Sequence, residues 1–140
     1  MPLTSDDEIR SLLDLQTVAV VGCSTTPGKA AHEIPAYLQR QGYEVVPVNP
    51  FADEVLGERA YDSLVDVEQA VDLVNVFRPS EAVPGVVDDV LTRHEERADV
   101  QALWLQLGIT HDEAVARAED AGLRVVQDRC LKVEHRRLLD

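Results

Sequence analysis

The sequence contains Thr17-Val18-Ala19-Val20-Val21, a continuous β-rich apolar run that leads directly into Gly22-Cys23-Ser24. Such a run is typical of a strand covered on both faces, as in a parallel sheet. Residues 31–41 follow with apolar side chains at helical spacing and stop at a glycine. Because proline is tolerated only in the first turn of a helix, Pro35 predicts that this helix begins late, near residue 31 or 32.

The alternation of strand and helix continues to the end of the chain. Apolar segments predict further strands over residues 43–48, 72–77, 101–106 and 123–127. Capping boxes that begin at Ser5 and Thr110 predict one helix after residue 5 and another from about 110 to Gly122. Apolar periodicity predicts a helix over 81–96. The segment 51–71 is expected to be irregular, with a short helix near 64–70. Strands that alternate with helices imply a parallel sheet with crossover connections. The sequence therefore predicts a doubly wound α/β fold: a five-stranded parallel sheet in three layers.

Composition sets limits on the class of protein. The length of 140 residues fits one domain over residues 1–140. A net charge of −13 would repel nucleic acid, no apolar run is long enough to cross a membrane, and the acidic N-terminus lacks an export signal. We therefore expect a cytoplasmic protein without nucleic-acid or membrane partners. The excess of acids over few lysines suggests a halophilic protein, because high salt screens self-repulsion.

Cysteine and histidine usage does not indicate a metal site. Cys23 and Cys130 form no metal-ligand pair by spacing, and they are too few for a disulfide framework. The four histidines share no ligand spacing, so we expect them at the surface.

The segment from Gly22 to Ala30 is small, rich in hydroxyl groups, and leads from a strand into a helix. Free amides and the macrodipole at a helix start favour anions, so the segment predicts a phosphate site. Ser24, Thr25 and Lys29 could supply further donors. Serine occupies the second glycine position of a dinucleotide fingerprint, the third glycine is displaced to Gly28, and the spacing does not match a P-loop.

Two further strand ends are expected at the same edge of the sheet. The second strand ends at Asn49, where NAD enzymes place an acid that holds the ribose hydroxyls. An acid would repel a phosphate on the ribose, whereas neutral Asn49 with Lys29 nearby would not. A ligand with a phosphorylated ribose therefore fits better than NAD. The next strand ends in Phe77-Arg78-Pro79. Arg78 could pair with a phosphate or stack on a base, whereas Phe77 and Trp104 are expected in the core.

No residue is predicted to be catalytic. The sequence offers no acid–base pair with an evident task, and Ser24 lacks the glycine pattern of a hydrolase nucleophile. The basic residues of the C-terminal segment are expected to pair with acids on the body of the protein; they are Arg129, Lys132, Arg136 and Arg137.

Ordered motifs from about Leu15 to Leu138 resemble the stand-alone CoA-binding proteins, a family related to the CoA-binding domain of the succinyl-CoA synthetase alpha subunit. The motifs that carry this resemblance are Gly22-Cys23-Ser24, Pro27-Gly28-Lys29, Pro47-Val48-Asn49-Pro50, Val76-Phe77-Arg78-Pro79, Leu103-Trp104-Leu105-Gln106-Leu107-Gly108 and Asp128-Arg129-Cys130-Leu131.

The resemblance implies a Rossmann-like domain that binds coenzyme A or acyl-CoA. By that analogy Gly22, Ser24, Thr25 and Lys29 hold the phosphates, Pro47, Val48 and Asn49 flank the adenosine end, and Phe77, Arg78 and Pro79 line the pantetheine path. Because the chain ends before a second, phosphohistidine-bearing domain, we expect a binding module without catalysis of its own.

Two alternatives stay open: an NAD(P)-dependent oxidoreductase or other nucleotide-cofactor enzyme, and an accessory subunit of an acyl-CoA synthetase. Cys23 and Cys130 follow strands one and five. Either thiol could form a mixed disulfide with bound CoA if it were exposed and its pKa lowered, although buried, unreactive thiols are the simpler expectation.

Overall fold

The computed structural model describes residues 1–139 and contains the predicted parallel sheet. Its strands lie in the order β2-β1-β5-β6-β7, and every pairing between neighbours is parallel. Their bounds are β1 Thr17–Val21, β2 Glu44–Val48, β5 Leu73–Val76, β6 Ala102–Leu105 and β7 Arg124–Val126. The fold is therefore the Rossmann-like α/β class that the sequence predicts.

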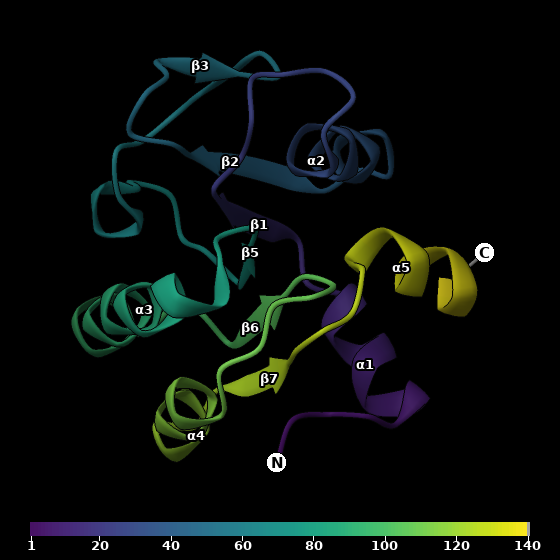
Figure 1. The fold of residues 1–140 in the computed structure, drawn as a ribbon, viewed down its shortest axis with the longest axis vertical. Coiled ribbons are helices and arrows are strands. Elements are labelled where there is room, and N and C mark those ends of the chain that lie inside the picture. The colour runs from purple at the N-terminus through teal and green to yellow at the C-terminus, as the bar shows by residue number, and fades with distance from the viewer. Residues whose placement is uncertain (140) are drawn as a thin grey trace.

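Helices cover both faces of this sheet (Figure 1). On one face lie α1 (Asp6–Leu13), α2 (Ala30–Arg40) and α5 (Leu131–Leu139), and on the other α3 (Val83–Arg97) and α4 (Asp112–Asp120). None of the helices described is long and apolar enough to cross a membrane.

The segment expected to be irregular contains short elements that the sequence did not reveal. A two-stranded antiparallel hairpin forms from β3 (Glu54–Val55) and β4 (Glu58–Arg59). The helix predicted near residues 64–70 is only a 3-10 turn, η1 (Leu64–Asp66), and a second such turn, η2 (Ser80–Ala82), precedes α3.

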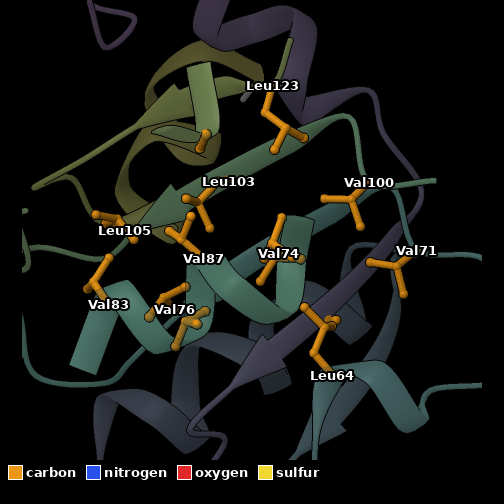
Figure 2. Packing of buried hydrophobic residues seen from close by; sticks show 14 of the residues in the cluster. Leu64, Val71, Val74, Val76, Val83, Val87, Val100, Leu103, Leu105 and Leu123 are labelled. Carbon is orange, nitrogen blue, oxygen red and sulfur yellow. The ribbon is translucent and has the colours of Figure 1, made fainter. Parts of the chain in front are cut away.

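The core between the sheet and α3 is built from branched apolar side chains (Figure 2). Val74 and Val76 of β5 point toward Val83 and Val87 of α3, and all four are fully buried. Burying one such side chain stabilises a fold by roughly 1.5 kcal/mol or more. This packing fixes α3 against the sheet.

One capping box is confirmed and the other is shifted. Ser5 accepts a hydrogen bond from the backbone N–H of Glu8 and donates to its carboxylate. Before α4, the cap is His111 rather than Thr110, with the imidazole Nδ1 accepting from the N–H of Ala114 at 3.1 Å. The N–H of Thr110 instead donates to Ser80 Oγ, which holds Thr110 outside the helix.

Buried Arg93 of α3 holds the segment around η1 in place. Its guanidinium donates to the carbonyl oxygens of Leu64, Val67 and Gln69 and pairs with Asp99 at 2.8 Å. These bonds satisfy both the buried charge and carbonyl groups that lie outside regular structure. The path of residues 64–69 is therefore set by a side chain from the following helix.

In the C-terminal basic segment, which contains α5, Arg129 and Arg137 pair with acids as expected, but no ion pair within residues 1–139 involves Lys132 or Arg136. Buried Glu134 accepts from Arg129 at 2.6 Å and from Arg137 at 2.8 Å, and Arg137 also pairs with Asp6 of α1. Hydrogen bonding from Arg137 is the main reason that the pKa of Glu134 lies below its usual value. This cluster fastens both ends of the chain to each other.

The expectation that all histidines lie at the surface is wrong for His135. This side chain is 6% exposed, and its Nδ1 lies 2.6 Å from the hydroxyl oxygen of Tyr37 on α2. An amphipathic C-terminal helix places it there, and the tyrosine supplies the polar partner that burial requires.

Glu134→Gln should destabilise the protein by about 2 kcal/mol at pH 7, because it weakens hydrogen bonds to two charged groups. Urea denaturation would measure the difference. The folded pKa of Glu134 is lowered, so its stabilisation is complete above the ordinary carboxyl pKa and is lost as the pH falls through the lowered value. The difference in free energy of unfolding between the wild type and Glu134→Gln should therefore become smaller below about pH 4.

Glu95→Gln is the matched control, because Glu95 is exposed on α3 and no ion pair within residues 1–139 involves it. It should change stability little at any pH. Equal effects of the two substitutions would contradict the role assigned to Glu134.

Candidate functional site

A cleft of about 650 Å³ opens where β1, β2 and β5 end. The connection from β1 runs to one side of the sheet and the connection from β5 to the other, so this is the topological switch point at which α/β folds bind ligands. Residues that directly follow the three strands line it. The strand order thus positions the site before any side chain is considered.

Gly22 allows β1 to pass close to β5 at the base of the cleft. Its φ is +87°, and a Cβ there would lie 3.3 Å from Arg78 Cδ and from the backbone of Phe77. Its N–H donates to the carbonyl of Val48 at 3.0 Å. A larger residue would be strained and would displace Arg78.

Pro35 anchors the loop between β1 and α2, although it lies beyond the first helical turn, where a proline was not expected. The helix α2 begins at Ala30, so Pro35 lies in its second turn rather than its first. Proline has no N–H for the carbonyl four residues earlier, which belongs to Ala31. That carbonyl accepts instead from the N–H of Ser24 at 2.9 Å, which ties the loop to the helix.

Asn49 joins the loops that follow β1 and β2. Its Nδ2 donates to the carbonyl of Cys23 at 2.9 Å, and its Oδ1 accepts from the N–H of Phe51 at 2.8 Å. Both ends of the amide are engaged within the protein. Asn49 therefore lines the cleft and also holds the two loops at its rim together.

The loop side of the cleft carries positive charge and unused donors. Within residues 1–139, no ion pair involves Lys29 or Arg78, although both line the cleft. The hydrogen bonds described for this part of the chain leave the N–H groups of Ala30 and Ala31, at the start of α2, unused. A helix start of this kind beside two cations has the chemistry to attract an anion.

One carboxylate competes with an anion at this point. Glu33, in the first turn of α2, accepts from the N–H of Gly28 at 2.6 Å through its Oε1. The bond shapes the loop, but it also puts a negative charge beside the donors.

Most of the predicted site residues meet at the cleft. Those that line it are Gly22, Ser24, Lys29, Val48, Asn49, Phe77 and Arg78. The others lie beside it: Thr25 and Gly28 are exposed on the loop, Pro47 is buried within β2, and Pro79 is exposed at the start of η2. Phe77 packs against the core as well as lining the cleft, and Trp104 is fully buried, as expected.

Several lining residues were missed because they follow no strand of the sheet directly. Phe51, Ser63 and Leu64 come from the segment expected to be irregular, and Val86 and Asp89 come from α3. The only sequence signal was an acid at position 89 next to the apolar stripe of a predicted helix.

The two thiols differ in place. Cys23 is fully buried beside the cleft, and burial raises the pKa of its thiol to about 12. Cys130 is partly buried and does not line the cleft. At neutral pH Cys23 is protonated and is a poor nucleophile.

Comparison with known proteins gives one family. The family model described as CoA binding domain matches residues 16–136. The uncharacterized protein YneT of Bacillus subtilis is 39% identical over 132 residues, which are 94% of each chain. A solved structure from Thermus thermophilus superposes with a TM-score of 0.89 at 42% identity, covering 97% of this chain and 100% of that one.

The chain is also similar to part of a larger enzyme. ADP-forming acetate–CoA ligase I of Archaeoglobus fulgidus is 32% identical over 121 residues, which are 83% of this chain. The match spans only 18% of the ligase.

Pro35→Ala should loosen the loop without weakening the helix. The new N–H competes for the carbonyl of Ala31, so the amide of Ser24 should exchange with solvent severalfold faster in hydrogen-exchange NMR. Pro84→Ala is the control, because Pro84 lies in the first turn of α3, where the amide has no helical partner. Unchanged protection of Ser24 in Pro35→Ala would show that the loop is held by other contacts.

Proposed function

This chain belongs to the CoA binding domain family, and on that premise we propose that it binds coenzyme A or an acyl-CoA in the cleft at the ends of β1, β2 and β5. The diphosphate lies over the loop 22–29 and the first amides of α2. The observation that carries the proposal is that Lys29 and Arg78, which form no ion pair within residues 1–139, lie beside backbone donors that no described hydrogen bond uses, in a protein of net charge −13.

The ribose phosphate gives the proposal its specificity. The end of β2 carries neutral Asn49 instead of an acid, so a phosphorylated ribose meets no carboxylate there. Lys29 lines the same cleft and supplies the counter-charge. This arrangement supports CoA in preference to NAD.

The chemistry of the cleft supports binding rather than covalent reaction. The thiol of Cys23 is protonated at neutral pH, and Ser24 Oγ accepts a hydrogen bond from the N–H of Thr26. The similarity to the acetate–CoA ligase favours a second candidate, an accessory subunit that presents CoA to a catalytic chain. Its matched region is a small part of that ligase, so we propose no ligase activity for this chain alone.

Calorimetric titration with CoA, dephospho-CoA and NAD tests the proposal. CoA should bind most tightly, and loss of its 3′-phosphate should weaken binding. Lys29→Ala should weaken CoA binding about tenfold or more, since hydrogen bonds to charged groups contribute about 1.5–3 kcal/mol. Lys132→Ala removes the chain's other lysine, which lies on α5 over the ring of Tyr37 from α2, and it should leave affinity for CoA unchanged.

Equal affinity for the three ligands would contradict the ribose-phosphate contact. Failure of CoA to bind the folded protein would overturn the proposal as a whole.

Glu33→Gln should raise CoA affinity severalfold. Glutamine keeps an oxygen that can accept from Gly28, while the negative charge beside the diphosphate is removed. The gain should shrink in 1 M salt, where the Debye length is about 3 Å. Glu44→Gln, at the amino end of β2, is the matched control and should have little effect. Weaker binding in Glu33→Gln would show that the carboxylate itself is needed to shape the loop.

A further inference from the structure

The side of the cleft formed by η1 and α3 presents hydrogen-bond acceptors. Ser63 Oγ donates to Asp89 Oδ2 at 3.5 Å and accepts from the N–H of Val65. This contact, at the long limit of a hydrogen bond, places the serine hydroxyl beside the carboxylate. No hydrogen bond within residues 1–139 uses Asp89 Oδ1, so this oxygen is available to a ligand.

Asp89 is held in an environment that makes it selective. It is partly buried, and burial is the main reason that the pKa of its carboxyl is raised. Its partner Ser63 is fixed as the cap of η1, and η1 itself is fixed by the buried guanidinium of Arg93. A partly desolvated acceptor with one free oxygen favours a ligand that donates a hydrogen bond there.

Charge decides which part of the ligand lies on this side. Asp62 and Asp89 line it, whereas Lys29 and Arg78 are the cations that line the cleft. A polyanion gains most when its phosphates lie by the two cations and its uncharged part faces the two carboxylates. An uncharged part of the ligand is therefore expected beside the Ser63–Asp89 pair.

The apolar part of the lining suits a flat ring. Val48, Leu64 and Val86 are buried residues that line the same cleft, and Leu64 and Val86 belong to η1 and α3. Phe51 lies at the rim with its side chain 93% exposed, so its ring is free to stack on a base. These surfaces fit a purine better than a flexible polar chain.

We propose that Asp89 is a specificity-determining residue that accepts a hydrogen bond from the exocyclic amine of adenine and so selects a 6-aminopurine over a 6-oxopurine. This inference rests on the proposed function, because it assigns the base end of the same ligand. A 6-oxo group would place an acceptor against the carboxylate and leave both without a donor.

The test compares CoA with its deaminated analogue, in which hypoxanthine replaces adenine. The wild-type protein should bind CoA at least tenfold more tightly. In Asp89→Asn the side-chain amide can rotate to donate to the 6-oxo group. The ratio of the affinity for CoA to the affinity for the analogue should therefore fall to about one or reverse. Ser63→Ala, which frees the carboxylate to turn, should lower the ratio less.

Asp66→Asn is the matched control, because it makes the same change of charge at an exposed residue of η1 that does not line the cleft. It should raise affinity for both ligands equally and leave the ratio unchanged. Thermal melting of each variant confirms that the comparison is made on folded protein.

Two results would overturn the inference and leave CoA binding intact. One is equal affinity of the wild-type protein for CoA and its hypoxanthine analogue. The other is an equal change of both affinities in Asp89→Asn, which would place Asp89 against a part common to the two ligands. If neither ligand binds the wild-type protein, the proposed function and this inference fail together.

Discussion

The handedness of the crossover connections creates the cleft on which the site depends. Parallel strands are joined by right-handed crossovers, and β1 has β2 on one side and β5 on the other. The helices that follow β1 and β5 therefore lie on opposite faces of the sheet. Neither covers the carboxyl ends of the two central strands, and backbone donors and side chains meet in the space between them.

Three buried or half-buried polar groups give this space a fixed shape. The carbonyl of Ala31, freed by Pro35, holds the first loop; the amide of Asn49 links that loop to the second; and Arg93 fixes the segment around η1. Each arrangement satisfies backbone groups that would otherwise be buried without partners. Part of the cleft wall thus comes from segments without regular pairing, and these polar contacts hold those segments in place.

The sequence predicted what depends on local pattern. Every strand of the sheet was expected close to its observed bounds, because apolar runs of β-prone residues leave little choice of structure. Gly22 directly follows β1, Lys29 closes the loop that leads from β1 into α2, and Arg78 lies two residues after β5, so topology alone brought them together. The predicted cap of α4 was wrong by one residue, because the N–H of Thr110 donates a hydrogen bond to Ser80 and the capping-box pattern is not followed.

What could not be predicted depends on tertiary contacts. Pro35 was interpreted as a limit on where α2 can begin, because a proline inside a helix leaves the carbonyl four residues earlier without its donor. In the structure that carbonyl, of Ala31, has another donor, the N–H of Ser24, which lies eleven residues before Pro35. The sequence does not indicate this contact. The Ser63–Asp89 pair joins two segments through the packing of α3, and no spacing in the sequence indicates it. Motifs at strand ends therefore revealed the anion side of the cleft and not the opposite side.

The balance of charge explains why backbone donors matter in this protein. A chain of net charge −13 repels a polyanion at long range, and additional lysines near the cleft would attract the protein's own carboxylates. Amides at the start of α2 attract an anion at contact without bearing a full charge that an internal carboxylate could neutralise. Glu33 shows the limit of this arrangement, because a carboxylate of α2 already accepts from one loop amide. In the proposed function, a ligand phosphate competes with the protein's own acids, and Lys29 and Arg78, which pair with no acid in the part of the chain described, favour the ligand.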